Sequence, residues 1–125
     1  MKLLLAGFGG AIGSMARYLV TGLAQRLLDV QFPLGTLVVN AVGCLVIGVL
    51  MSLVEDRQLL SPDTRVLLMV GVLGGFTTFS AFGYETIQML RHGDVRFAAL
   101  NVAANLALSL GAVAAGWMTT RAMLT

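Results

Sequence analysis

Charge is scarce in this sequence: Asp, Glu, Lys and Arg make up only 11% of its 125 residues. A soluble domain carries about a quarter of its residues as charged side chains, which keep its surface in water. Here 58% of the residues are hydrophobic and the mean hydropathy is +0.90, so lipid must surround much of the chain. The net charge of +2 is too small and too scattered for a nucleic-acid partner.

Residue types that catalyse reactions or bind metals are also scarce. Cys44, the only cysteine, cannot form an intrachain disulfide and lies in an apolar run, which is typical of a small packing residue. His92, the only histidine, lies between Arg91 and Gly93, which indicates a loop. Because the sequence contains no hydrolytic triad, metal-ligand cluster or phosphate-binding loop, we do not expect an enzyme.

Four apolar segments dominate the chain, each close to the roughly 20 residues that a membrane-spanning helix requires. They cover about residues 3–23, 34–54, 66–90 and 97–118. Pro33 precedes the second segment, and Ser61 opens a Ser-Pro-Asp sequence before the third; both features are typical of helix starts. The connections are short and hold most of the charges. The sequence therefore predicts an all-α integral membrane protein with a single four-helix domain over residues 1–125.

The positive charges do not select an orientation in the membrane. With four spans, one side carries the N-terminus, the second connection and the C-terminus, with Lys2, Arg57, Arg65 and Arg121. The other side carries Arg26, Arg91 and Arg96, and also Arg17 if that side chain extends to the interface. So small a bias leaves two interpretations. Either the chain has few charges to count, or copies insert in both orientations and pair as an antiparallel dimer.

The third segment contains an unusual run of small and hydroxyl residues at mid-membrane depth, namely Gly71, Gly74, Gly75, Thr77, Thr78 and Ser80. Glycine and threonine are poor helix formers, so the backbone can leave its helical hydrogen-bond ladder here. In a membrane, irregular backbone persists only where it is buried or lines a cavity, and its carbonyls can coordinate a cation. The alternative is a packing notch whose hydroxyls bond back to the helix.

Three side chains near mid-membrane depth could contact an anion. Phe79 and Phe82 are three residues apart, so a helical turn would place both rings on one face. They are either packing residues or an anion contact, because the edge of a phenyl ring is positive. Asn40 lies in the apolar second segment, where its NH₂ group can donate to another helix or to an anion.

The fourth segment carries two stripes with a spacing of four residues. The small residues are Ala103, Ala107, Gly111 and Ala115, and the polar residues are Asn101, Asn105 and Ser109. The small stripe predicts close contact between helices. The polar stripe predicts either a wet path or a hydrogen-bonded seam.

Two charged residues lie within or beside the apolar segments. Arg17 is either an interfacial anchor or a charge that raises the anion concentration at a pore mouth. Glu85 is its candidate partner or an interfacial residue.

Taken together, three motifs resemble the CrcB/Fluc family of fluoride channels. They are GGAIGSMARY at residues 9–18, PLGTLVVN at residues 33–40 and GVLGGFTTFSAF at residues 71–82. The motifs occur in the order typical of that family, and the four-helix plan covers the whole chain. The third motif is the most specific.

The resemblance implies an antiparallel, dual-topology homodimer in a bacterial inner membrane, with a break in the third helix and two pores for passive fluoride export. It implies a structural sodium ion bound by the backbone carbonyls of Gly74 and Thr77. The implied fluoride path comprises Asn40, Phe79, Ser80, Phe82, Asn101, Asn105 and Ser109, with Arg17 at the vestibule. The sequence departs from the family at Ala81 and Gly83, where members often have a hydroxyl residue.

Two other functions remain open at this stage. A small drug/proton antiporter has the same four-helix plan but needs a carboxylate within the membrane, and the first segment has no acid. An assembly subunit that does not transport would use the polar rows only to hold helices together.

Overall fold

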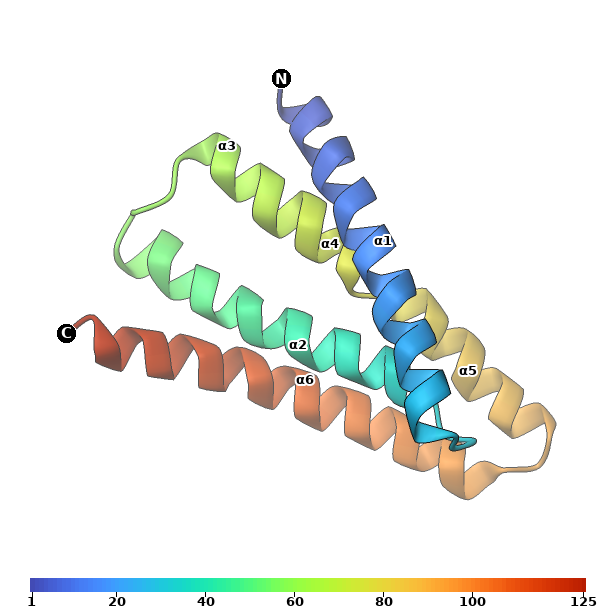
Figure 1. Ribbon diagram of the computed structural model, residues 1–125. Helices are drawn as coiled ribbons and strands as arrows, with labels where there is room; N and C mark the ends of the chain where they lie inside the picture. The colour runs from blue at the N-terminus through green and yellow to red at the C-terminus, as the bar shows by residue number, and fades with distance from the viewer.

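The computed structural model describes all 125 residues, and its ordered elements are all helical (Figure 1). In chain order they are α1 (Lys2–Leu28), α2 (Leu34–Met51), the π-helical turn η1 (Ser52–Asp56), α3 (Pro62–Arg65), the π-helical η2 (Val66–Leu73), α4 (Gly74–Phe76), α5 (Phe79–Arg91) and α6 (Val95–Met123). They form four helical spans long and apolar enough to cross a membrane: Lys2–Leu28, Leu34–Asp56, Pro62–Arg91 and Val95–Met123. The prediction of four long apolar helices is therefore confirmed.

The helices extend past the predicted apolar ranges because helical hydrogen bonding continues into polar residues. At the start of the third span, the Ser61 hydroxyl accepts a hydrogen bond from the Thr64 N–H at 3.2 Å, so the predicted helix cap is confirmed. The first span ends at Leu28, and the next residue, Asp29, adopts the left-handed conformation with φ 37°. Gly93, with φ 83°, makes the tight turn between α5 and α6 possible, since a side chain rarely adopts that conformation.

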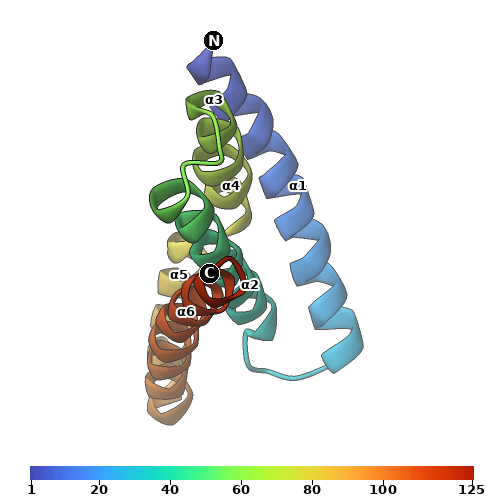
Figure 2. The same cartoon turned by 90° about the vertical axis from the view of Figure 1, so that its left-hand side faces the viewer.

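Glycines allow the helices to approach closely in two places. Along α1, a Cβ on Gly13 would lie 2.0 Å from the Val72 carbonyl oxygen, so α1 packs directly on the backbone of η2. Between α2 and α6, a Cβ on Gly48 would lie 2.2 Å from the Val113 carbonyl oxygen. The same pairings appear in the ribbon: α1 runs beside η2 and α4, the part of the third span between the labels α3 and α5, and α2 runs beside α6 (Figures 1 and 2).

The small-residue stripe of α6, predicted for close helix contact, does not face another helix of the same chain. Its four members, Ala103, Ala107, Gly111 and Ala115, are all exposed within the chain. Gly111 has open space where a Cβ would stand, whereas Gly116 is buried against α2. Packing of α6 within the chain therefore uses the face of Gly116, and the stripe remains on an open surface.

The chain ends and connections divide between two ends of the bundle. The turns that follow α1 and α5 lie together at one end, and the two termini and the connection before α3 lie toward the other (Figure 1). The exposed cations Arg26, Arg91 and Arg96 belong to the first end, and Lys2, Arg57, Arg65 and Arg121 to the second. Both ends of the molecule are therefore similarly basic.

Candidate functional site

The backbone of the third span is extended at two residues in its middle. Thr77 has φ −82° and ψ 159°, and Thr78 has φ −153° and ψ 112°. Helix α4 ends before them at Phe76, and α5 begins after them at Phe79. The Thr78 hydroxyl accepts a hydrogen bond from the Ala81 N–H at 3.1 Å and so caps α5. The Thr77 hydroxyl bonds back to the Leu73 carbonyl at 2.9 Å.

Asn40 of α2 is bound to this extended segment. Its Oδ1 accepts from the Thr78 N–H at 2.7 Å, and its Nδ2 donates to the Thr78 carbonyl at 3.1 Å. In a continuous helix the Thr78 N–H would instead bond the Gly74 carbonyl, which therefore lacks its helical partner. Likewise, the Ala81 N–H is directed to the Thr78 hydroxyl. The carbonyls of Gly74 and Thr77 are thus available to another ligand.

A hollow of about 240 Å³, here called the inner hollow, lies beside the extended segment. It is lined by Asn40, Cys44, Thr77, Thr78, Phe79, Phe82, Asn105, Leu106, Ser109 and Leu110. Its walls are largely apolar, with a few amide and hydroxyl groups and no acidic or basic side chain. Such a lining can surround a partly dehydrated small ion but offers no carboxylate for proton exchange.

The two phenyl rings in this lining differ in exposure. Their centroids are 5.3 Å apart, and their planes are tilted by 53°. Phe82 is only 9% exposed and packs inside the chain, whereas Phe79 is 80% exposed. The inner hollow is therefore walled by the protein on the side of Phe82 and open on the side of Phe79.

The polar residues of α6 behave differently from one another. Asn105, which is 5% exposed, accepts from Asn40 Nδ2 at 3.2 Å. Asn101 is fully buried and donates to the Thr86 hydroxyl at 3.0 Å. The Ser109 hydroxyl is buried and has no hydrogen-bond partner. Asn101 and Asn105 thus form a seam between helices, while Ser109 retains a free donor beside the inner hollow.

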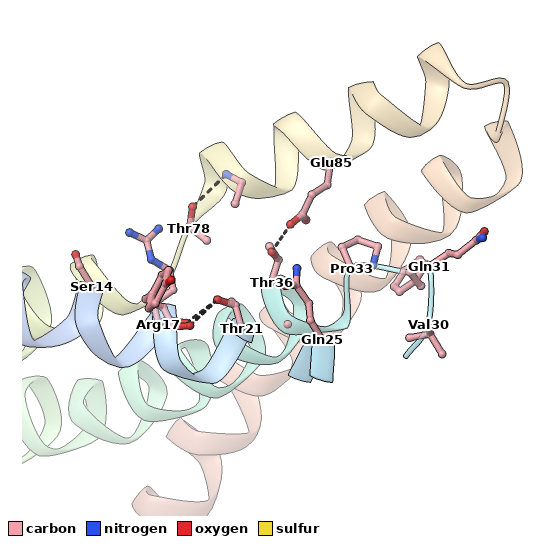
Figure 3. A pocket seen from close by; sticks show the side chains of 14 residues that line it. Ser14, Arg17, Thr21, Gln25, Val30, Gln31, Pro33, Thr36, Thr78 and Glu85 are labelled. Carbon is pink, nitrogen blue, oxygen red and sulfur yellow. Dashed lines mark hydrogen bonds between the residues drawn. The ribbon is translucent and has the colours of Figure 1, made fainter. Parts of the chain in front are cut away.

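A second, more polar hollow of about 510 Å³, here called the outer hollow, lies toward the turns that follow α1 and α5 (Figure 3). Arg17, Thr36, Thr78 and Glu85 are among its lining residues. Thr78 lines both hollows and is buried, so it stands between them. The two hollows therefore meet at the extended segment.

Glu85 is not the partner of Arg17. Its Oε1 accepts a hydrogen bond from the Thr36 hydroxyl at 2.6 Å, and its Oε2 is buried without any partner (Figure 3). The carboxylate thus joins α5 to the first turn of α2. The interpretation of Glu85 as a counter-ion of Arg17 is wrong: the packing of α2 on α5 brings the Thr36 hydroxyl to the carboxylate, and no ion pair joins it to Arg17 of α1.

The structure gathers most of the predicted path residues and separates the others. Those in the inner hollow are Asn40, Phe79, Phe82, Asn105 and Ser109. Arg17 lines the outer hollow, and Asn101 and Ser80 line neither, although the Ser80 hydroxyl lies 3.3 Å from that of Thr78. Sequence reasoning gave no individual role to Thr78 or Thr36. The only signal at Thr78 was its place in the glycine–threonine run.

Comparison with known proteins identifies similar chains over nearly the whole length. Residues 4–117 match the family model described as CrcB-like protein, Camphor Resistance (CrcB). A fluoride-specific ion channel FluC from Methylobacillus flagellatus is 50% identical over 110 residues, covering 87% of this chain and 86% of its own. Proteins of the same name from Rhizobium johnstonii and Clostridium novyi are 46% and 42% identical, covering 98% and 92% of this chain and the same shares of their own.

Proposed function

We propose a path for fluoride through this chain, which belongs to the CrcB-like family and whose relatives are fluoride-specific ion channels. The protein is a multi-pass membrane channel for fluoride, not an enzyme. The observation that carries the path is the inner hollow, in which aromatic, amide and hydroxyl groups from three spans meet beside extended backbone.

Fluoride holds its water strongly, so a pore must replace that hydration without retaining the ion. Each group in the inner hollow is a weak ligand. The edges of Phe79 and Phe82 are positive, and the free Ser109 hydroxyl can donate a hydrogen bond. Several weak ligands in sequence favour entry and still permit exit, which suits passive conduction.

Asn40 can donate to fluoride only if it gives up a hydrogen bond within the protein. Both hydrogens of its NH₂ group are engaged, one by the Thr78 carbonyl and one by Asn105 Oδ1. Donation to fluoride therefore requires one of these bonds to open as the ion passes. The amide would then reclose behind the ion, which keeps the residence time of the anion short.

Arg17 is proposed as the vestibule charge. It lines the outer hollow, and no other basic side chain does. A cation at a pore mouth raises the local anion concentration and the rate of entry. Ser80 and Asn101 stay in the proposed path only as supports, since neither lines a hollow.

An antiparallel homodimer in the bacterial inner membrane would complete the pore. Phe79 is 80% exposed and the inner hollow is open on its side, so a second chain is needed to close the path. Similar basic charge at the two ends of the bundle supports insertion in both orientations. Membrane lipid would cover the remaining apolar surface.

A structural sodium ion fits the carbonyls released at the break. Gly74 and Thr77 lack their helical partners, and Gly74 is exposed. Two carbonyls from each of two chains would give four oxygen ligands, the donor type that hard cations prefer. Bound there, sodium would supply a fixed positive charge that links the two broken helices.

Purified protein in liposomes tests this function. Fluoride-loaded vesicles should release fluoride passively and electrogenically, with little dependence on pH, when a potassium ionophore balances the charge. Proton-coupled uptake of an organic cation would instead identify an antiporter, and no flux of either kind would identify an assembly subunit. The inner hollow has no carboxylate, and Glu85, which lines the outer hollow, is bonded to Thr36; both facts argue against the antiporter.

A further inference from the structure

A continuous series of hydrogen bonds, here called the hydrogen-bond chain, connects the extended segment to the carbonyl of Phe82, in the turn of α5 that carries both rings. From donor to acceptor, its links are Thr78 N–H to Asn40 Oδ1 (2.7 Å), Asn40 Nδ2 to Asn105 Oδ1 (3.2 Å), Asn105 Nδ2 to Asn101 Oδ1 (2.9 Å), Asn101 Nδ2 to Thr86 Oγ1 (3.0 Å) and Thr86 Oγ1 to the Phe82 carbonyl (2.7 Å). These hydrogen bonds pass from the extended segment through α2 and α6 to α5.

All five bonds point in the same direction. Each asparagine accepts at its oxygen and donates from its nitrogen, so the amide dipoles lie head to tail. Bonds in such a chain polarise and strengthen one another, and the effect is greatest away from water. Asn101 is fully buried and Asn105 is 5% exposed, so the central links are shielded.

The two ends of the chain bracket the ring pair. Thr78 precedes Phe79, and the last acceptor is the carbonyl of Phe82 itself. The chain therefore fixes the first turn of α5 against α2 and α6. Neither Thr86 nor Asn101 lines the inner hollow. Asn101 can therefore act on the rings through its hydrogen bonds, and Thr86 acts on them through its bonds to Asn101 and to the Phe82 carbonyl.

We propose that Thr86 and Asn101 are positioning residues, which set the orientation of Phe79 and Phe82 through this hydrogen-bond chain without contacting the ion. The proposal rests on the fluoride path described above. The polar residues of α6 then have two roles: Asn101 holds the ring-bearing turn of α5 in place, and Ser109 contacts the ion.

The test compares Thr86→Val with Thr86→Ser. Valine keeps the shape of threonine but removes the hydroxyl, which ends the chain at Asn101. Fluoride flux per folded dimer should fall about fivefold or more, the factor that corresponds to the loss of one buried hydrogen bond. Serine keeps the hydroxyl and should restore most of the flux. Thr119→Val, the same change at an exposed position of α6, should leave the flux unchanged.

A second readout does not depend on conduction. This readout is the side-chain amide signal of Asn40 in nitrogen-15 NMR spectra of the intact protein, assigned by its loss in Asn40→Ser. Asn40 is three hydrogen bonds away from Thr86, so its signal reports on the hydrogen-bond chain at a distance from the substitution. It should shift in Thr86→Val and remain in place in Thr86→Ser and Thr119→Val. A merely local packing role would not move this signal.

The outcomes separate this inference from the function on which it rests. If the native protein conducts fluoride but Thr86→Val changes neither flux nor the Asn40 signal, the positioning role is overturned and the channel stands. If Thr86→Ser lowers the flux about fivefold and shifts the Asn40 signal relative to the native protein, the methyl group and not the hydroxyl is responsible, which also overturns it. This second arm needs only the serine variant and the native protein, so it applies even if the valine variant does not fold. A shifted Asn40 signal in a protein without fluoride flux would uphold the chain and overturn the proposed function.

Discussion

The Asn40 carboxamide and the Thr78 peptide exchange two hydrogen bonds, at 2.7 and 3.1 Å, across the contact between α2 and the third span. An extended residue in an antiparallel sheet exchanges the same pair of bonds with its neighbour. Here a single side chain supplies both. The extended backbone is thereby satisfied without a strand, and the position of Asn40 becomes inseparable from that of the segment it holds.

Replacement of Asn40 by aspartate should impair conduction more than replacement by serine. The carboxylate can still accept from the Thr78 N–H, but it faces the Thr78 carbonyl and Asn105 Oδ1 without a donor, and it repels fluoride. We expect the aspartate variant to carry about tenfold less flux than the serine variant, equivalent to ~1.4 kcal/mol. Fluoride efflux from liposomes measures the difference. Faster efflux through the aspartate variant would refute the donor role of Asn40.

Replacement of either phenylalanine by isoleucine should reduce fluoride flux, because an aliphatic side chain has no positive edge. The two variants should differ in stability. Phe82 is buried, so Phe82→Ile should also lower the thermal midpoint of the protein, by an amount equivalent to about 1–3 kcal/mol. Phe79→Ile should not lower it within the single chain. Size-exclusion chromatography verifies the assembly, and undiminished flux in both variants would exclude a role for the ring edges.

Ser109→Ala should reduce flux without loss of stability. The Ser109 hydroxyl is buried and unpartnered, so its removal breaks no bond within the protein and relieves a polar group of its desolvation cost. Efflux assays and thermal unfolding of the same preparation measure both quantities. Asn105→Ala provides the contrast, since it breaks the bonds to Asn40 and Asn101 and should lower stability as well. Unfolding of Ser109→Ala at a markedly lower temperature would indicate a structural hydroxyl instead.

Arg17→Gln should slow fluoride entry most strongly at low ionic strength. Arg17 is half-buried and lines the outer hollow. The field of a charge that faces water extends over about 30 Å at 0.01 M salt but only about 8 Å at 0.15 M, so salt should diminish, without abolishing, the difference between the variant and the native protein. Initial efflux rates at the two salt concentrations give the comparison. Arg96→Gln removes an equal charge from the same end of the bundle but outside the outer hollow, and it serves as the control. Equal effects of the two substitutions would contradict a specific vestibule role.

The sequence predicted elements more reliably than contacts between them. Hydropathy located the four spans, and the Ser61 cap could be predicted because both depend on residues close together in the chain. The pairing of Glu85 with Thr36 could not be predicted. Opposite charge favoured Arg17 as the partner, but the rotation and register of two distant helices decide which group faces a carboxylate.

The stripes of α6 illustrate the same limit. A spacing of four residues correctly indicates that side chains share a face, but it does not say what covers that face. The small stripe that includes Gly111 is open within the chain, and Gly116 makes the contact with α2. Likewise, spacing grouped Asn101 with Ser109, although burial separates a hydrogen-bonded support from a free hydroxyl.

The bond between Asn40 and Thr78 also governs how the nascent protein can enter the bilayer. The two residues are 38 positions apart, so α2 is synthesised first and meets the third span only later. Until then, the Thr78 N–H must either bond the Gly74 carbonyl in a continuous helix or stay unsatisfied, and an unsatisfied peptide group in hydrocarbon costs several kcal/mol. The third span should therefore enter the membrane as a continuous helix and open at Thr77 and Thr78 only when it docks on α2.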